Sequence, residues 1–173
     1  MITKSNKKYY STKQEKDVAR CFDAKTTVAS GAFWGMKGDV RSEDFLIECK
    51  TTGNSYYTFK SLTWEKISSE ALKDRMKTPL LVIDFHNSHK ERFVCFSADL
   101  LELEEGGHHL LPEWVSTVYY VSNPDKCQYR FKGLEGSHPA LHLELKGKKY
   151  NMVNVIFMRI EDFIRFSNEA GSF

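Results

Sequence analysis

Apolar residues recur along the chain with two different periods, and this pattern predicts both helices and strands. A spacing of three and four residues predicts amphipathic helices over residues 11–23, 63–76 and 160–166. Alternating or short continuous apolar runs predict strands at 26–29, 38–40, 45–50, 56–59, 80–85, 92–96, 119–121, 129–131, 141–145 and 150–158. Strands and helices interleave, so the predicted fold class is α/β, with a central mixed β-sheet flanked by helices.

The length of 173 residues fits one domain with one sizeable core. We expect residues 11–173 to form this domain, with a motif-bearing core at about 11–103 and a C-terminal β-rich extension after it. Residues 1–10 are predicted to be a flexible basic arm, which either solubilises the start of the chain or lies along nucleic-acid phosphates. The arm holds no acidic residue, and its basic residues are Lys4, Lys7 and Lys8.

The stretch with the most candidate chemistry is 38–52, read GDVRSEDFLIECKTT. Its two ends are predicted to pair as a short hairpin, because 41–44 are polar residues suited to a turn. Side chains alternate between the faces of a strand, so Glu48 and Lys50 share one face, about 7 Å apart at Cα. The turn brings Asp39 back beside Glu48. Two carboxylates and one ammonium at a strand end predict a site for a divalent ion that prefers oxygen ligands, such as Mg²⁺.

A Glu-x-Lys triplet arises easily by chance, because both residues are among the commonest in proteins. The chain has a second one, Glu144-Leu145-Lys146. We interpret it as part of a solvated edge strand, since no Gly-Asp hairpin precedes it. At Glu48 the surrounding run is apolar and Asp39 lies nine residues upstream. Charged side chains within an apolar run are costly to bury, so a functional role would account for them. A purely structural role for them is the alternative.

Two upstream features belong with the hairpin. The first predicted helix carries Glu15 on or beside its apolar stripe. This residue either points at the strand end with Asp39 or is a first-turn acid favoured by the helix dipole. A loop with several glycines then leads to the hairpin, and its backbone N–H groups are suited to holding a phosphate. The candidate phosphate contacts in this loop are Ser30, Gly31 and Lys37.

The order of these residues resembles a known signature. Gly38-Asp39, eight intervening residues and Glu48-x-Lys50 resemble the motif of the restriction-endonuclease-like nucleases, the PD-(D/E)xK superfamily. The usual proline is Gly38 here, a common variation. A helix glutamate, a Ser-Gly loop, an aspartate and then Glu-x-Lys form an order similar to that of the archaeal and phage-type Holliday junction resolvases. The resemblance covers about residues 11 to 85, and the chain from about 99 onward carries none.

The resemblance implies a metal-dependent, structure-specific DNA endonuclease, most similar to a Holliday junction resolvase that hydrolyses phosphodiester bonds near branch points. It implies Mg²⁺, for which Mn²⁺ can substitute, and a symmetric homodimer that acts on branched double-stranded DNA. The nearest alternative is another nuclease of the same superfamily, acting in restriction, repair or phage DNA degradation. A non-catalytic DNA-binding protein is a more distant one.

Site roles follow from the same resemblance. The implied catalytic residues are Asp39, Glu48, Lys50 and Glu15. The implied metal ligands are Asp39, Glu48, the backbone carbonyl of Cys49, and Glu15. Lys60 follows the strand after the Glu-x-Lys triplet, where similar nucleases often bring a basic or amide side chain to the site. The implied DNA contacts are Ser30, Gly31, Lys37 and Lys60, together with Lys4, Lys7 and Lys8 of the arm.

The composition indicates where the protein acts more clearly than it indicates what reaction it carries out. Hydrophobic residues make up 41% and charged residues 28% of the chain, as in soluble globular proteins, and the formal charge of +2 predicts no general affinity for nucleic acid. The four cysteines form no CxxC pair, which favours free thiols in a reducing compartment and argues against zinc. No apolar run approaches a membrane span or a signal region. We therefore expect a cytoplasmic protein without a membrane partner. A phage-encoded protein that acts in the cytoplasm of its host also fits this expectation.

Overall fold

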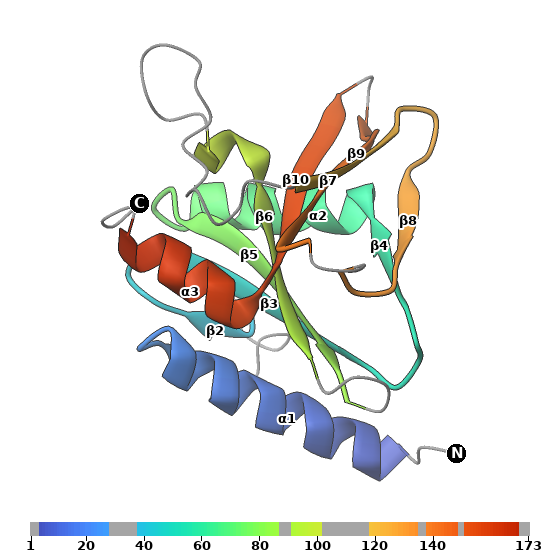
Figure 1. Ribbon diagram of the computed structural model, residues 1–173. Helices are drawn as coiled ribbons and strands as arrows, with labels where there is room; N and C mark the ends of the chain where they lie inside the picture. The colour runs from blue at the N-terminus through green and yellow to red at the C-terminus, as the bar shows by residue number, and fades with distance from the viewer. Residues whose placement is uncertain are drawn as a thin grey trace.

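The computed structural model describes residues 4–27, 38–86, 91–101, 118–134, 138–148 and 151–169. These residues form α-helices and strands layered around one large sheet (Figure 1). In chain order the elements are α1 (Lys4–Cys21), β1 (Lys25–Thr26), β2 (Val40–Arg41), β3 (Phe45–Thr52), β4 (Tyr57–Lys60), α2 (Ser61–Lys73), β5 (Thr78–Phe85), β6 (Arg92–Ser97), the short 3-10 helix η1 (Ala98–Leu101), β7 (Val118–Asn123), β8 (Gln128–Phe131), β9 (Ala140–Lys146), β10 (Met152–Arg159) and α3 (Ile160–Glu169).

Eight strands form one mixed sheet in the order β1-β2-β3-β5-β6-β10-β9-β7. β3 pairs with β5 and β9 pairs with β7 in parallel, while the other neighbours are antiparallel. A parallel pair needs a long crossover, and between β3 and β5 the chain supplies it through β4 and α2. The predicted α/β class with a mixed sheet flanked by helices is confirmed. The C-terminal strands lengthen this same sheet, so the β-rich extension is continuous with the motif-bearing core.

The sheet has a hydrophobic core on each face. On one face, α1 and α3 pack over alternate residues of the strands, among them Ile47 and Val82. On the other face, α2 packs over the intervening residues, such as Leu81 and Ile83. Alternate side chains of β5 therefore face opposite layers of helices, with α1 and α3 on one side of the sheet and α2 on the other (Figure 1).

β4 and β8 form a separate two-stranded antiparallel sheet, which we call the ribbon. Phe59 of β4 and Phe131 of β8 are fully buried in the same core as α2. The ribbon therefore covers the α2 side of the large sheet and presents its opposite face to solvent.

The first helix differs from its predicted extent. α1 begins at Lys4, so most of the segment predicted to be a flexible arm is helical. No Gly or Pro interrupts Lys4–Cys21, and the run is rich in residues that favour helix. Ser11, predicted to begin the helix, lies inside it, and its hydroxyl donates to Oε1 of Glu15 at 3.0 Å.

The second Glu-x-Lys triplet also differs from its prediction. β9, which contains Glu144, pairs with β10 on one side and β7 on the other, so it is an internal strand and not an edge strand. None of the helices in the described part of the chain is long and apolar enough to cross a membrane.

Candidate active site

The predicted hairpin is formed by β2 and β3. Val40 pairs with Ile47, and the Asp39 N–H donates to the Ile47 carbonyl at 2.9 Å. Continuing this antiparallel register by one residue places Asp39 next to Glu48. The turn and the alternation along β3 thus bring together the two carboxylates that lie nine residues apart in the sequence.

Gly38 gives the hairpin its entry conformation. Its φ is +74°, and a Cβ at this position would lie 2.8 Å from Cδ1 of Leu46. Proline cannot occupy such a position, because its ring fixes φ near −65°. The glycine that stands in place of the usual proline of the resembling nucleases is therefore required by the backbone of this hairpin.

Lys50 binds two of the predicted metal ligands. Its Nζ donates to Oε1 of Glu48 and, at 3.3 Å, to the backbone carbonyl of Cys49. These two oxygens thus already share one cation, the ammonium of Lys50. The Lys50 side chain is 38% exposed and that of Glu48 is 23% exposed, so solvent reaches the pair.

Asp39 binds the backbone of the same residue, Cys49, through its N–H group. The Cys49 N–H donates to Oδ2 of Asp39 at 2.8 Å. The Cys49 thiol points away into the buried core, where burial raises its pKa well above the usual value and the charges of Asp39, Glu15 and Glu48 raise it further. The thiol is therefore neutral at ordinary pH, and the backbone of this residue, rather than its sulfur, takes part in the site.

α1 brings Glu15 to the hairpin. Partial burial raises the pKa of Glu15 above its usual value of 4.5, and the charges of Asp39 and Glu48 add to this effect. The hydrogen bond from Ser11 and the charge of Lys50 lower the pKa and only partly offset the increase. Glu15 therefore belongs to one electrostatic group with the hairpin residues. We call Glu15, Asp39, Glu48 and Lys50 the carboxylate cluster.

Gln14 ties α1 to the strands beneath the cluster. Its side-chain amide donates to the Lys50 carbonyl at 3.1 Å and to the Val82 carbonyl at 3.2 Å, and the residue is 2% exposed. Gln14 stands three residues after Ser11, a spacing typical of a helix-capping pair, but its side chain makes no such cap. Its partners are backbone carbonyls of β3 and β5, which no local sequence pattern identifies.

The carboxylate cluster has an excess of negative charge. Three carboxylates against one ammonium leave a net charge of −2 when all four groups are ionised. Burial by itself lowers the pKa of Lys50, but the hydrogen bond and charge of Glu48, with the charge of Asp39, outweigh it and raise the pKa. Lys50 therefore stays cationic at neutral pH, so it serves as a charge and a hydrogen-bond donor rather than as a base.

Tyr57 of β4 borders the cluster and was not predicted to do so. Burial raises its pKa to about 12, and the negative charge of Glu48 contributes to the increase. The sequence-based candidate from this strand was Lys60, three residues later. Alternation along β4 turns Tyr57 and Phe59 inward and Lys60 outward, and this pattern is the signal that could have identified Tyr57.

A second aromatic group lies where β5 ends. Nδ1 of His86 is 2.9 Å from Oγ1 of Thr51, and its ring stacks on Tyr10 of α1 with 4.3 Å between ring centres. Thr51 directly follows Lys50, so this contact fixes the end of β3 next to the cluster. Residues 87–90 lie outside the described part of the chain.

The other predicted DNA contacts lie away from the cluster or outside the described residues. Lys60 is exposed at the junction of β4 and α2. Lys8 is exposed on α1. Lys4 and Lys7 lie in the first turns of α1, where the structure describes only the backbone. Ser30, Gly31 and Lys37 lie outside the described residues.

The donor set of the cluster fits a hard divalent cation. Within the described ranges, no three His, Cys, Asp or Glu side chains are close enough together to hold a metal ion as they stand. The available groups are nevertheless carboxylate and carbonyl oxygens with a negative excess, which are the ligands that Mg²⁺ prefers. Glu48 and the Cys49 carbonyl already converge on one cation, the Lys50 ammonium. The residues present therefore suit Mg²⁺ better than a metal that prefers sulfur or imidazole.

Comparison of the chain with models of known families, with curated proteins and with solved structures found no match. The functional argument therefore depends on the residues and geometry of the carboxylate cluster.

Proposed function

We propose that the protein is a metal-dependent endonuclease that hydrolyses phosphodiester bonds in DNA. The observation that carries this proposal is the arrangement around the backbone N–H and carbonyl of Cys49. Asp39 binds its N–H, and Lys50 bridges its carbonyl to Glu48. The same residues carry the resemblance to the restriction-endonuclease-like nucleases.

In this proposal the chain holds Mg²⁺ through Asp39, Glu48 and the Cys49 carbonyl, and Glu15 either completes the shell or holds a second ion. When bound, the ion supplies Lewis-acid chemistry, which stabilises developing negative charge and makes water more acidic. Lys50, kept cationic by its acidic neighbours, donates hydrogen bonds that orient the attacking water or offset charge on a non-bridging phosphate oxygen.

The reaction needs no covalent enzyme intermediate. A water oxygen forms a bond to phosphorus while the bond from phosphorus to the leaving sugar oxygen breaks. The attacking water loses one proton to solvent and the leaving oxygen gains one from it, so one water molecule is consumed per cut. The neutral, buried thiol of Cys49 takes no part in this step.

The sharper proposal is that the substrate is branched double-stranded DNA, with the protein acting as a Holliday junction resolvase. It is supported by the chain order of Glu15, the Ser-Gly loop and the hairpin, as in the resembling resolvases. A four-way junction presents paired scissile phosphates and one cluster supplies one cut, so a two-fold homodimer suits this substrate. A nuclease of the same superfamily that acts on other DNA is the alternative.

Cleavage of end-labelled four-way, forked and linear DNA of the same sequence, with and without Mg²⁺, tests both the metal-dependent nuclease and the resolvase proposal. We expect paired, symmetric cuts near the branch point of the four-way junction, and none in EDTA. Full activity in EDTA would overturn the metal-dependent nuclease. Equal cutting of linear duplex, together with a monomer in sedimentation, would overturn the resolvase and leave the nuclease standing.

A further inference from the structure

The ribbon differs in charge from the rest of the chain. The whole sequence nearly balances 25 basic residues against 23 acidic ones. Residues 51–64 and 126–134, which contain both strands of the ribbon, hold four basic residues and no acidic residue. The four basic residues are Lys60, Lys126, Arg130 and Lys132.

The register of the ribbon places its polar side chains on the outer face. Phe59 and Phe131 point into the core and are fully buried. The intervening residues therefore face outward, and among them Lys60, Gln128 and Arg130 are exposed. The outer face consists of two cross-strand pairs, Thr58 with Arg130 and Lys60 with Gln128. Every one of these four side chains can donate a hydrogen bond to an anion.

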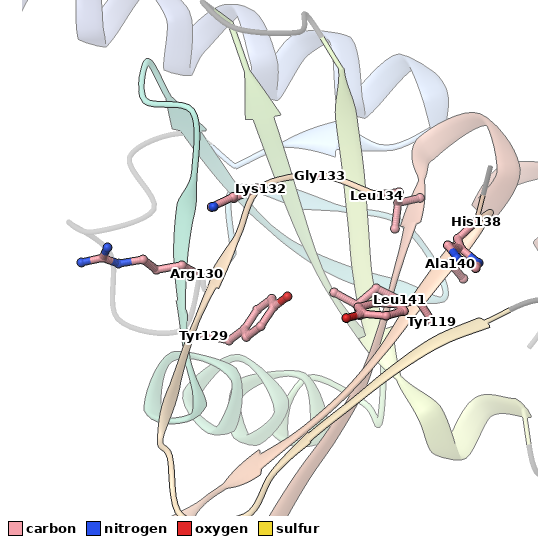
Figure 2. Close-up of a pocket in the computed structure, with 9 residues that line it drawn as sticks. All are labelled: Tyr119, Tyr129, Arg130, Lys132, Gly133, Leu134, His138, Ala140 and Leu141. Carbon is pink, nitrogen blue, oxygen red and sulfur yellow. The ribbon is translucent and has the colours of Figure 1, made fainter. Parts of the chain in front are cut away.

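Arg130 is held in place on this outer face. Tyr129, Arg130 and Lys132 are among the residues that line a pocket of about 190 Å³, and Figure 2 shows the Arg130 side chain extending toward β4. The guanidinium carbon of Arg130 lies 5.1 Å from the centre of the Tyr56 ring. This cation–π contact lowers the entropy that the arginine loses when it binds a phosphate.

The ribbon is connected directly to the carboxylate cluster. β3, which bears Glu48 and Lys50, continues through residues 53–56 into β4. Tyr57, the first residue of β4, is close enough to Glu48 for the carboxylate charge to contribute to its raised pKa. The ribbon therefore has one end near the cluster, at Tyr57 and Phe131, and its other end at Lys60 and Gln128.

We propose that the outer face of the ribbon, with Lys60, Arg130 and Lys132, binds the sugar-phosphate backbone of the DNA that enters the carboxylate cluster. The inference rests on the proposed function for the identity of the nucleic acid, and it assigns the surface that supplies the affinity. The outer face of the ribbon offers cations and neutral hydrogen-bond donors, which match phosphates. It therefore reads backbone and shape rather than sequence.

The charge of the cluster favours such a surface. Without its ion, a group of side chains with a net charge of −2 repels a polyanion, and one divalent ion neutralises this charge without making it positive. The formal charge of the whole chain is only +2, so a local region of positive charge favours DNA binding. Within the described residues the ribbon provides one.

The test measures DNA binding separately from cleavage. Fluorescence anisotropy with a labelled four-way junction, and with a duplex of unrelated sequence, is recorded for Glu48→Gln protein over a range of salt concentrations. Adding Arg130→Ala and Lys132→Ala should weaken binding about tenfold at 0.1 M salt. It should also reduce the slope of log K against log salt by about 2, one unit for each lost phosphate contact. The loss should be the same for both DNA sequences.

Two matched variants serve as controls. Arg20→Ala with Arg165→Ala removes the same charge from exposed arginines of α1 and α3, on the opposite side of the sheet, and should leave the slope unchanged. Arg130→Lys with Lys132→Arg preserves the charge and should keep the slope of the parent. A circular dichroism melt of each variant shows that the fold is retained.

The outcomes separate the two proposals. A ribbon variant with the slope of its parent, or a loss equal to that of the α1–α3 control, would overturn the ribbon proposal while leaving a nuclease in place. Retention by polyglutamate or by vesicles of an anionic lipid, lost in the ribbon variant while DNA binding persists, would assign the surface to another partner. A reduced slope in the ribbon variant, together with a wild-type chain that cleaves no DNA in Mg²⁺, would preserve the ribbon proposal and overturn the nuclease.

Discussion

The chain contains the same triplet, Glu-x-Lys, on two strands of one sheet, and the two copies have different surroundings. On β3, Lys50 binds Glu48, and Asp39 and Glu15 add negative charge beside them. On β9, Glu144 accepts a hydrogen bond from the Tyr120 hydroxyl. The residues opposite Glu144 on the neighbouring strands are Asn154 and Ser122, which are both neutral.

The difference shows that the triplet does not make a site by itself. Both copies lie on internal strands, so position in the sheet does not distinguish them. The distinguishing features are the hairpin that returns Asp39 to β3 and the helix that carries Glu15. These supply the additional carboxylates that a cation site requires.

The largest expected difference between the two copies is in cleavage. Glu48→Gln or Asp39→Asn should reduce the rate of Mg²⁺-dependent cleavage by about a thousandfold, because several kcal/mol of transition-state stabilisation are lost with the ion. Glu144→Gln, the matched change on β9, should leave the rate unchanged. Single-turnover cleavage of labelled DNA measures all three variants. Equal losses at Glu48 and Glu144 would show that the triplets act through stability alone.

The next largest difference is expected between the lysines of the two triplets, Lys50 and Lys146. Lys50→Ala should lower the cleavage rate by about a hundredfold, the usual effect of removing one donor that stabilises developing charge. Lys146→Ala should have no effect, because this side chain is exposed. DNA affinity should survive in both variants. For a dimeric resolvase, mixed dimers of wild-type and Lys50→Ala chains should nick one strand of a junction, while wild-type dimers cut two strands symmetrically. Symmetric double cutting by isolated mixed dimers would contradict this.

Glu15 should show a smaller effect, on stability and its pH dependence. The pKa of this carboxyl is raised in the folded protein, so folding favours the protonated form, and the charged form destabilises the fold above the folded pKa. Glu15→Gln should therefore raise the melting temperature at pH 7. The gain should shrink as the pH falls and vanish below about pH 4, where the carboxyl is protonated in both states.

Two comparisons check the cause of this gain. Adding Mg²⁺ should raise the melting temperature of the wild-type protein more than that of the Glu15→Gln variant. The ion offsets the repulsion between the Glu15 carboxylate and the neighbouring carboxylates. Glu144→Gln should not raise the melting temperature, since its carboxylate accepts a hydrogen bond from Tyr120. A gain at Glu15 that does not change between pH 4 and pH 8 would point to a cause other than charge.

The smallest expected effect compares two tyrosines. Burial is the main cause of the raised pKa of Tyr57, about 12, so Glu48→Gln should lower it only slightly. The hydrogen bond to Glu144 is the main cause of the raised pKa of the exposed Tyr120. Glu144→Gln should therefore lower the pKa of Tyr120 most of the way to its usual value. Alkaline titration by ultraviolet absorbance, as a difference against Tyr57→Phe and Tyr120→Phe, measures each. A large fall for Tyr57 would mean that burial is not the dominant cause.

The hairpin was predictable because its information is local. The turn residues, the alternation along β3 and the nine-residue separation of Asp39 and Glu48 are all contained in one short stretch. The same is true of the α/β class, which follows from the periods of the apolar residues. Gly38 was recognised as a substitute for proline, but its positive φ emerges only from the folded hairpin.

Features that depend on distant partners could not be predicted in the same way. Gln14 matches a helix-cap pattern with Ser11, yet its partners are carbonyls 36 and 68 residues away. The parallel pairing of β7 with β9, which makes β9 internal, is not encoded in the pattern of either strand. Lys60 was proposed from the resemblance, whereas the alternation along β4 would have pointed to Tyr57, which packs against the core.

The reach of Gln14 has a consequence for the order of folding. All four residues of the carboxylate cluster lie within the first 50 residues, but the strand that supports them, β5, runs from Thr78 to Phe85. Pairing of β3 with β5 closes a long loop, and such non-local contacts form slowly. A chain still emerging from the ribosome would therefore carry every side chain of the cluster before it had the scaffold to align them. If the proposed function holds, the protein would gain its activity only once β5 is available to fold.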